Sequence, residues 1–93
     1  MNYILLKWFH NFKNEPYLIY SEIDNQRYEV RKIEVYKNGT IHKCDKKMTN
    51  SLIELGDVEF PENLDEINQD KQFYAKYISR EEFESIWNSN KYY

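Results

Sequence analysis

The pair Asn38-Gly39 constrains the fold of this chain more than any other feature, because it separates two runs rich in β-branched and aromatic residues, 28–36 and 41–44. Asn-Gly in this setting predicts a β-hairpin, since a type I′ turn needs positive φ at both of its central residues. Such a turn also fixes which residues face each other across the hairpin. The predicted pairs are Lys37 with Thr40, Tyr36 with Ile41, Val35 with His42, Glu34 with Lys43, and Ile33 with Cys44.

The first hairpin strand contains a change of phase. Tyr28 and Val30 share one face of an ideal strand, whereas Ile33 and Val35 share the other. One extra residue resets a period of two, so a β-bulge near Arg31-Lys32 is predicted.

Other segments add strands to this hairpin. Residues 3–10 are apolar at both odd and even positions, which is typical of a strand that is central or covered on both faces. Residues 17–23 predict a second strand, and the polar stretch 24–26 predicts the turn after it. Residues 45–51 predict a loop and 52–55 a short fifth strand, while 73–78 are expected to be extended or irregular.

The clearest helix signal lies near the end of the chain. Ser79 and Glu82 form a capping box, and Ile78 with Phe83 occupies the positions of a hydrophobic staple. Phe83, Ile86 and Trp87 then form an apolar stripe. A shorter helix is predicted within 61–67, with Asn63 as its N-cap. The predicted fold is therefore one α+β domain over 1–93, with a four- to five-stranded, mostly antiparallel sheet and a helix over 79–89 packed on one face.

The composition of the chain and its first residues indicate the cellular compartment in which we expect the protein. A single cysteine cannot form an intramolecular disulfide, so the fold needs no oxidising compartment. The first eight residues lack a charged n-region, and their apolar run is too short for a signal peptide or a membrane span. We therefore expect a cytoplasmic protein with no membrane partner.

The charge is unevenly distributed along the chain. Residues 1–50 carry a net charge of +3, whereas residues 51–93 carry −6, with seven acids and no base between Glu54 and Asp70. This stretch repels phosphate, so direct nucleic-acid binding is disfavoured there, and it suits a basic protein partner. The alternative is a solvated face that only keeps the chain soluble. The predicted partner-binding residues are the first six of these acids and two tyrosines, since tyrosine is favoured at interface hot spots: Glu54, Asp57, Glu59, Glu62, Asp65, Glu66, Tyr74 and Tyr77.

Metal and nucleophile chemistry find little support in the sequence. His42 and Cys44 would share a strand face, but two ligands do not make a zinc site, so no metal and no cofactor are predicted. The same two residues are also compatible with a nucleophile–base pair or with simple packing.

A second function class remains open beside protein binding. It is a small enzyme or nucleic-acid-processing domain that uses His10, Glu15, Arg27 and Arg31, with His10 held by a carboxylate as general base. This hypothesis requires the four residues to converge in one cleft. Arg27, Arg31 and Lys32 beside Tyr28 also suggest a small basic-aromatic patch that could stack bases, although neighbouring glutamates half neutralise it.

Several motifs together resemble a family of small bacterial proteins that is known only as a domain of unknown function. They are Trp8-Phe-His10 followed by Phe12 and Glu15-Pro16, then Arg27-Tyr-Glu-Val-Arg-Lys-Ile-Glu-Val35, and finally Ser79-Arg-Glu-Glu-Phe83-Glu-Ser-Ile-Trp87. The resemblance runs in order over nearly the whole chain and implies one intact α+β domain. It supplies no catalytic residues.

Small self-contained proteins of this kind are often similar to toxin-neutralising immunity proteins or to phage-borne inhibitors of host defence. With the acidic stretch, the excess of tyrosine and the absence of a catalytic set, this association suggests a function. We expect a non-enzymatic protein-binding module, an inhibitor of a basic nuclease of the toxin-immunity or anti-CRISPR type.

Overall fold

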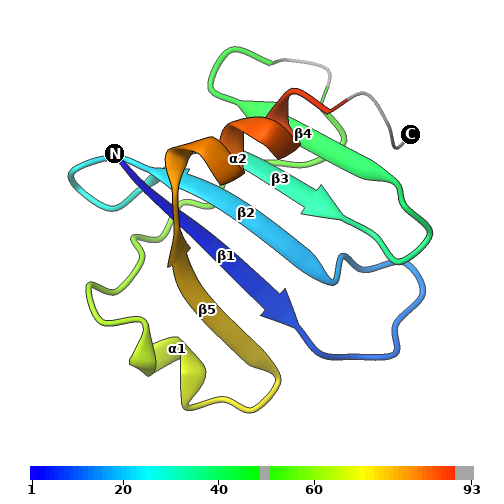
Figure 1. Cartoon of the computed structure of the whole chain (residues 1–93), viewed down its shortest axis with the longest axis horizontal. Coiled ribbons are helices and arrows are strands. Elements are labelled where there is room, and N and C mark those ends of the chain that lie inside the picture. Colours follow the sequence, from blue (N-terminus) through cyan, green and yellow to red (C-terminus); the bar gives the residue numbers. More distant parts are fainter. Residues whose placement is uncertain (49–50, 90–93) are drawn as a thin grey trace.

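A computed structural model describes residues 1–48 and 51–89 as a five-stranded antiparallel sheet with two helices (Figure 1). In chain order the elements are β1 (Asn2–Trp8), β2 (Leu18–Ile23), β3 (Glu29–Val35), β4 (Ile41–Asp45), α1 (Asp65–Asn68), β5 (Phe73–Ile78) and α2 (Arg80–Trp87). This is the α+β class that the sequence predicts.

The strand order β4-β3-β2-β1-β5 places β1 between β2 and β5. The interior position explains why β1 is apolar on both faces. Tyr3 is buried on the face that α2 covers, and Ile4 is fully buried on the opposite face. The sheet therefore separates two hydrophobic cores, and β1 contributes to both.

Helix α2 crosses one end of the sheet and closes the first core (Figure 1). Ser79 caps it, since the Ser79 hydroxyl accepts a hydrogen bond from the Glu82 N–H at 3.1 Å. Phe83 is fully buried against Tyr3, with ring centroids 5.3 Å apart. Ile78 packs against the same core, as the staple predicts. The helix is shorter than the predicted 79–89.

Arg31 fixes α2 to the sheet. Its guanidinium donates to both carboxylate oxygens of Glu22 on β2 and to both of Glu84 on α2, at 2.6 to 3.0 Å. It also lies over the rings of Phe83 and Trp87, at 4.8 and 4.9 Å from their centroids. One side chain thus joins two strands, the helix and its aromatic stripe.

The second core lies on the other face of the sheet, beneath α1 and the segment before it. Leu64 is buried there with Ile4, Ile23 and Ala75. Asn68 of α1 covers the free edge of β5, because its side-chain amide donates to the Ala75 carbonyl and accepts from the Ala75 N–H. This pairing satisfies backbone groups that an edge strand otherwise exposes.

The hairpin forms between the predicted strands, but the predicted turn type and register are wrong. Val35 pairs with Ile41 and Ile33 with Lys43, one residue away from the prediction. Only Gly39 of the turn has positive φ, at 91°, and the Asn38 side chain accepts a hydrogen bond from the Thr40 N–H instead of entering the left-handed region. The loop is therefore one residue longer than a type I′ turn requires.

This shift in register exchanges the faces of the hairpin residues. Ile33 and Val35 lie on the α2 face with Ile41 and Lys43, whereas His42 and Cys44 lie on the opposite face. The predicted cross-strand pair of Glu34 with Lys43 is replaced by Glu34 opposite His42.

The β-bulge predicted near Arg31-Lys32 is confirmed and lies at Val30, next to Arg31, since Glu22 pairs with Arg31 and Ile23 with Glu29. The prediction for the fifth strand requires correction. The fifth strand is β5 rather than residues 52–55, because β5 has the free edge of β1 to pair with, whereas residues 51–60 contain no strand.

The other loop predictions need smaller changes. The N-cap of α1 is Leu64, one residue beyond the predicted Asn63, whose side chain instead accepts from the Asp65 N–H. Residues 49 and 50 of the predicted 45–51 loop lie outside the described residues.

Candidate functional site

The acidic segment, defined here as residues 54–66, leads from the hairpin side of the sheet to α1 beside the β5 edge (Figure 1). All of its acidic side chains are exposed, and none takes part in an ion pair with another described residue. The carboxylates are Glu54, Asp57, Glu59, Glu62, Asp65 and Glu66. The six acidic residues predicted to bind a partner are therefore all exposed on one continuous segment of the chain.

Arg27 anchors the middle of the acidic segment. Its guanidinium donates to the carbonyl oxygens of Phe60 at 3.0 Å and Pro61 at 2.7 Å, and to the Tyr77 hydroxyl at 2.7 Å. The Arg27 backbone carbonyl accepts from the Phe60 N–H at 2.9 Å. A basic residue thus binds the segment through its backbone and leaves the carboxylates unpaired.

The start of the acidic segment is held by a buried carboxylate. Glu29 is 6 % exposed, and its two oxygens accept from the Ser21 hydroxyl at 2.6 Å and the Gly56 N–H at 2.7 Å. Lys32 donates to the Glu54 carbonyl at 3.0 Å. Because the bulge at Val30 sets the register of Glu29 opposite Ile23, it also brings this carboxylate to the face where the segment lies.

Two tyrosines extend the acidic surface. The Tyr77 hydroxyl donates to the Glu62 carbonyl at 3.0 Å, and the residue is 47 % exposed. The Tyr28 hydroxyl is hydrogen-bonded to Glu59, which raises the pKa of that phenol. Tyr74 is also exposed, but it lies three residues from Tyr77 on β5 and so faces the opposite side of the sheet. The structure therefore groups Tyr77 with the acids and separates Tyr74 from them.

The residues of the alternative enzyme hypothesis do not converge. His10 and Glu15 lie in the β1–β2 loop, whereas Arg27 lies in the β2–β3 loop at the other end of the sheet (Figure 1). Arg31 is engaged beneath α2. The cleft that this hypothesis requires is absent from the described part of the chain.

His10 has a structural role in its loop. Its Nδ1 accepts from the Phe12 N–H at 2.9 Å, so its Nε2 donates to the Pro16 carbonyl at 2.8 Å. Its ring also packs on Trp8, with centroids 4.3 Å apart. Both nitrogens are therefore committed to the backbone.

The basic-aromatic patch suggested by the sequence is occupied internally as well. Arg27 and Arg31 make the contacts described above, and Lys32 lies 3.4 Å from the Glu34 carboxylate. None of these cations is directed toward solvent as a phosphate-binding group.

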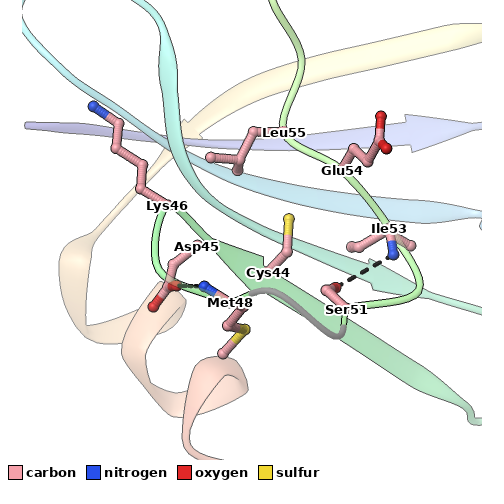
Figure 2. A pocket seen from close by; sticks show the side chains of 8 residues that line it. All are labelled: Cys44, Asp45, Lys46, Met48, Ser51, Ile53, Glu54 and Leu55. Carbon is pink, nitrogen blue, oxygen red and sulfur yellow. Dashed lines mark hydrogen bonds between the residues drawn. The ribbon is translucent and has the colours of Figure 1, made fainter.

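A pocket of about 430 Å³ lies beside Cys44, between β4 and residues 51–55 (Figure 2). The Cys44 side chain points into the space bordered by Ile53 and Leu55, and burial raises the pKa of its thiol. The Asp45 carboxylate accepts from two backbone N–H groups. This thiol lacks the electropositive, accessible setting of a reactive cysteine.

His42 and Cys44 do share a face, as predicted. The His42 ring packs edge-on against Tyr36, with centroids 5.0 Å apart. Among residues 1–48 and 51–89, no three His, Cys, Asp or Glu side chains are grouped closely enough to hold a metal. The pair therefore contributes to packing in this structure.

Sequence reasoning missed the residues that shape the acidic surface. Arg27 has a left-handed backbone, with φ of 72°, and no residue pattern signals that geometry in an arginine. Glu29 is a central anchor, yet in sequence it resembles an ordinary exposed strand glutamate. The signal lies in contacts that span 27 to 50 positions, which local patterns do not contain.

The fold and the site define a small antiparallel α+β domain with a backbone-anchored acidic segment. The chain belongs to the family described as "Domain of unknown function (DUF6881)", which matches residues 2–92. Comparison with curated proteins and with solved structures found no match. Neither helix in the described residues has the length and apolar character needed to span a bilayer.

Proposed function

We propose that this protein is a non-enzymatic protein-binding module that inhibits a basic partner, most specifically a nuclease, through its acidic segment. The observation that carries the proposal is the pattern of contacts around this segment. Arg27 and Lys32 bind its carbonyl groups and leave six carboxylates exposed without ion pairs among the described residues. If the acidic side chains served only to keep the protein soluble, the backbone that carries them would not have to be held by Arg27 and Lys32.

Electrostatics explains how such a surface would inhibit a nuclease. A nuclease cleft is lined with positive charge because it binds phosphates. A row of carboxylates on a fixed backbone offers complementary charge, and complementary charge accelerates association and selects the partner. Tyr77 and Tyr28 border the row and provide contact area with few rotatable bonds. Both a toxin-immunity role and an anti-CRISPR role use this mechanism.

The test is affinity capture from a lysate of the native host, or from the phage-infected host, at low and then moderate salt. We expect one stoichiometric basic partner that is released as salt increases, since screening weakens exposed charge pairs. Purified partner is then assayed for nuclease activity with and without the protein.

Two matched quadruple variants decide whether the acidic segment is responsible. In the first, Glu59, Glu62 and Glu66 are changed to Gln and Asp65 to Asn. In the second, Glu15, Glu81 and Glu82 are changed to Gln and Asp70 to Asn, which removes the same charge elsewhere. The first should lose the partner and the second retain it. Equal capture by both would refute the electrostatic proposal.

A further inference from the structure

Helix α2 covers only half of its face of the sheet. It packs over Tyr3, Ile33 and Ile41. Two adjoining grooves of about 440 and 200 Å³ lie beside the helix, and the second is also lined by Ile41 and by Ile86 of α2. Both are lined by Tyr17, Leu18 and Tyr20, so they form one continuous surface, which we name the open half-sheet.

Two lysines lie on the open half-sheet near its tyrosines. The register pairs Lys7 of β1 with Tyr74 of β5, and Leu5 with Lys76. Neither lysine forms an ion pair with another described residue. Tyr74 is 45 % exposed. In β1, β2 and β5, no acidic side chain occupies the uncovered part of these rows, whose members are Tyr74, Lys7 and Leu18 in one and Lys76, Leu5 and Tyr20 in the other. The acid near Tyr20 is Glu82 of α2.

We propose that the open half-sheet binds single-stranded nucleic acid. A single strand offers phosphates and flat bases, and this surface offers ammonium groups and aromatic rings, with Lys7 directly beside Tyr74. Lysines neutralise phosphates, and bases stack on aromatic side chains without regard to sequence. An exposed antiparallel sheet with aromatic residues is a recurrent platform for such binding.

Other occupants fit this surface less well. An acidic peptide would satisfy the lysines but has no flat rings to stack on the tyrosines. A second copy of the chain on the same face would place Lys7 and Lys76 against like charges. Charge complementarity together with stacking therefore favours the nucleic acid.

This binding is independent of the proposed inhibition. The open half-sheet and the acidic segment share no residue, and they differ in sign of charge. Tyr74, which the structure separates from the acidic surface, belongs to the open half-sheet. A failure of one proposal therefore leaves the other standing.

Fluorescence anisotropy with labelled oligo(dT) and oligo(U) of about ten nucleotides, a length within the site sizes of known single-strand binders, tests the proposal. We expect dissociation constants between about 1 and 100 μM at about 50 mM salt, weakening toward about 200 mM. The double variant Lys7→Glu/Lys76→Glu should bind at least about tenfold more weakly, and its plot of log affinity against log salt should be flatter by about 1.4. Tyr74→Ala should bind about tenfold more weakly, as the loss of one stacked base predicts.

The matched control is Lys46→Glu/Lys47→Glu, which makes the same charge change on exposed residues beyond β4. It should reduce affinity much less than the Lys7/Lys76 variant, with circular dichroism showing that both variants fold. No binding of either oligonucleotide up to about 100 μM at low salt overturns the proposal. Equal losses in both double variants also overturn it, as does binding of poly-glutamate in place of the oligonucleotides.

Discussion

Arg31 shows how one side chain can determine where a helix docks. Its removal leaves Glu22, whose side chain is 10 % exposed, without its cation. Breaking a buried pair in this way costs about 3 kcal/mol. We therefore expect Arg31→Ala to lower the free energy of unfolding by about 3 kcal/mol in urea denaturation, with Arg31→Lys intermediate because it keeps the charge but loses the bidentate fork.

Arg80 provides the control at the same scale. Its side chain is 73 % exposed and lies 3.7 Å from the Glu84 carboxylate. Exposed pairs contribute little, so Arg80→Ala should cost less than about 0.5 kcal/mol. Similar losses in Arg31→Ala and Arg80→Ala would show that Arg31 does not carry the docking of α2.

The same contacts predict an acid-sensitive stability. Arg31 holds the pKa of Glu22 and of Glu84 below the ordinary value of 4.5. The unfolded chain then binds more protons than the folded one at acidic pH. The stabilisation is therefore present above about pH 4.5 and is lost as pH falls through the lowered folded values. Thermal unfolding from neutral to acidic pH should show this loss, and Arg31→Met should show a shallower dependence.

At the scale of elements, Asn68 makes α1 a cover for a strand edge. It exchanges two hydrogen bonds with the Ala75 backbone, at 3.0 and 2.6 Å. Asn68→Ala should lower the free energy of unfolding by about 1–3 kcal/mol, because it leaves a paired backbone donor and acceptor unsatisfied. It should also increase concentration-dependent association through the exposed edge, measured by light scattering. Gln69→Ala, an exposed neighbour, should change neither quantity.

The elements also show what sequence could and could not predict. The N-cap at Ser79, the strand β1 that is apolar on both faces, and the hairpin follow from local chemistry, and all three are present. Of the two hydrogen bonds of the predicted capping box, the structure of the described residues contains the one from the Glu82 N–H to the Ser79 hydroxyl. The predicted turn type was wrong because the Asn38 side chain accepts a hydrogen bond from the Thr40 N–H. An Asn-Gly pair is compatible both with this side-chain bond and with a type I′ turn. Residues 73–78 were predicted only to be extended or irregular, because the pairing that makes them strand β5 depends on a vacant edge of β1, which is a property of the assembled sheet.

In the candidate site too, the features that depend on local sequence were predictable, whereas those that depend on distant contacts were not. The exposure of the acidic segment was predictable from its composition. Its anchors were not predictable, because the contacts of Arg27 and Glu29 with this segment span 27 or more positions. Arg31 was a candidate residue of the enzyme hypothesis, but its guanidinium is hydrogen-bonded to Glu22 and Glu84 and stabilises the fold.

At the scale of the whole molecule, the acidic segment should be a source of instability. Its six carboxylates fall within residues 54–66 and form no ion pairs with other described residues, so they repel one another. Neutralising Glu59, Glu62, Asp65 and Glu66 together should raise the melting temperature at low salt. The difference should shrink as salt is added, because the Debye length falls to about 8 Å at physiological ionic strength and screens exposed charges.

The control for this prediction is the matched variant at Glu15, Asp70, Glu81 and Glu82. Two of those residues lie in the first turn of α2, where negative charge is favourable. Their neutralisation should therefore stabilise less or even destabilise. If the acidic segment costs stability and its neutralisation also abolishes partner capture, then the carboxylates are kept for binding, as expected where function and stability conflict. A segment whose neutralisation changes neither melting temperature nor capture would be only a solvated face.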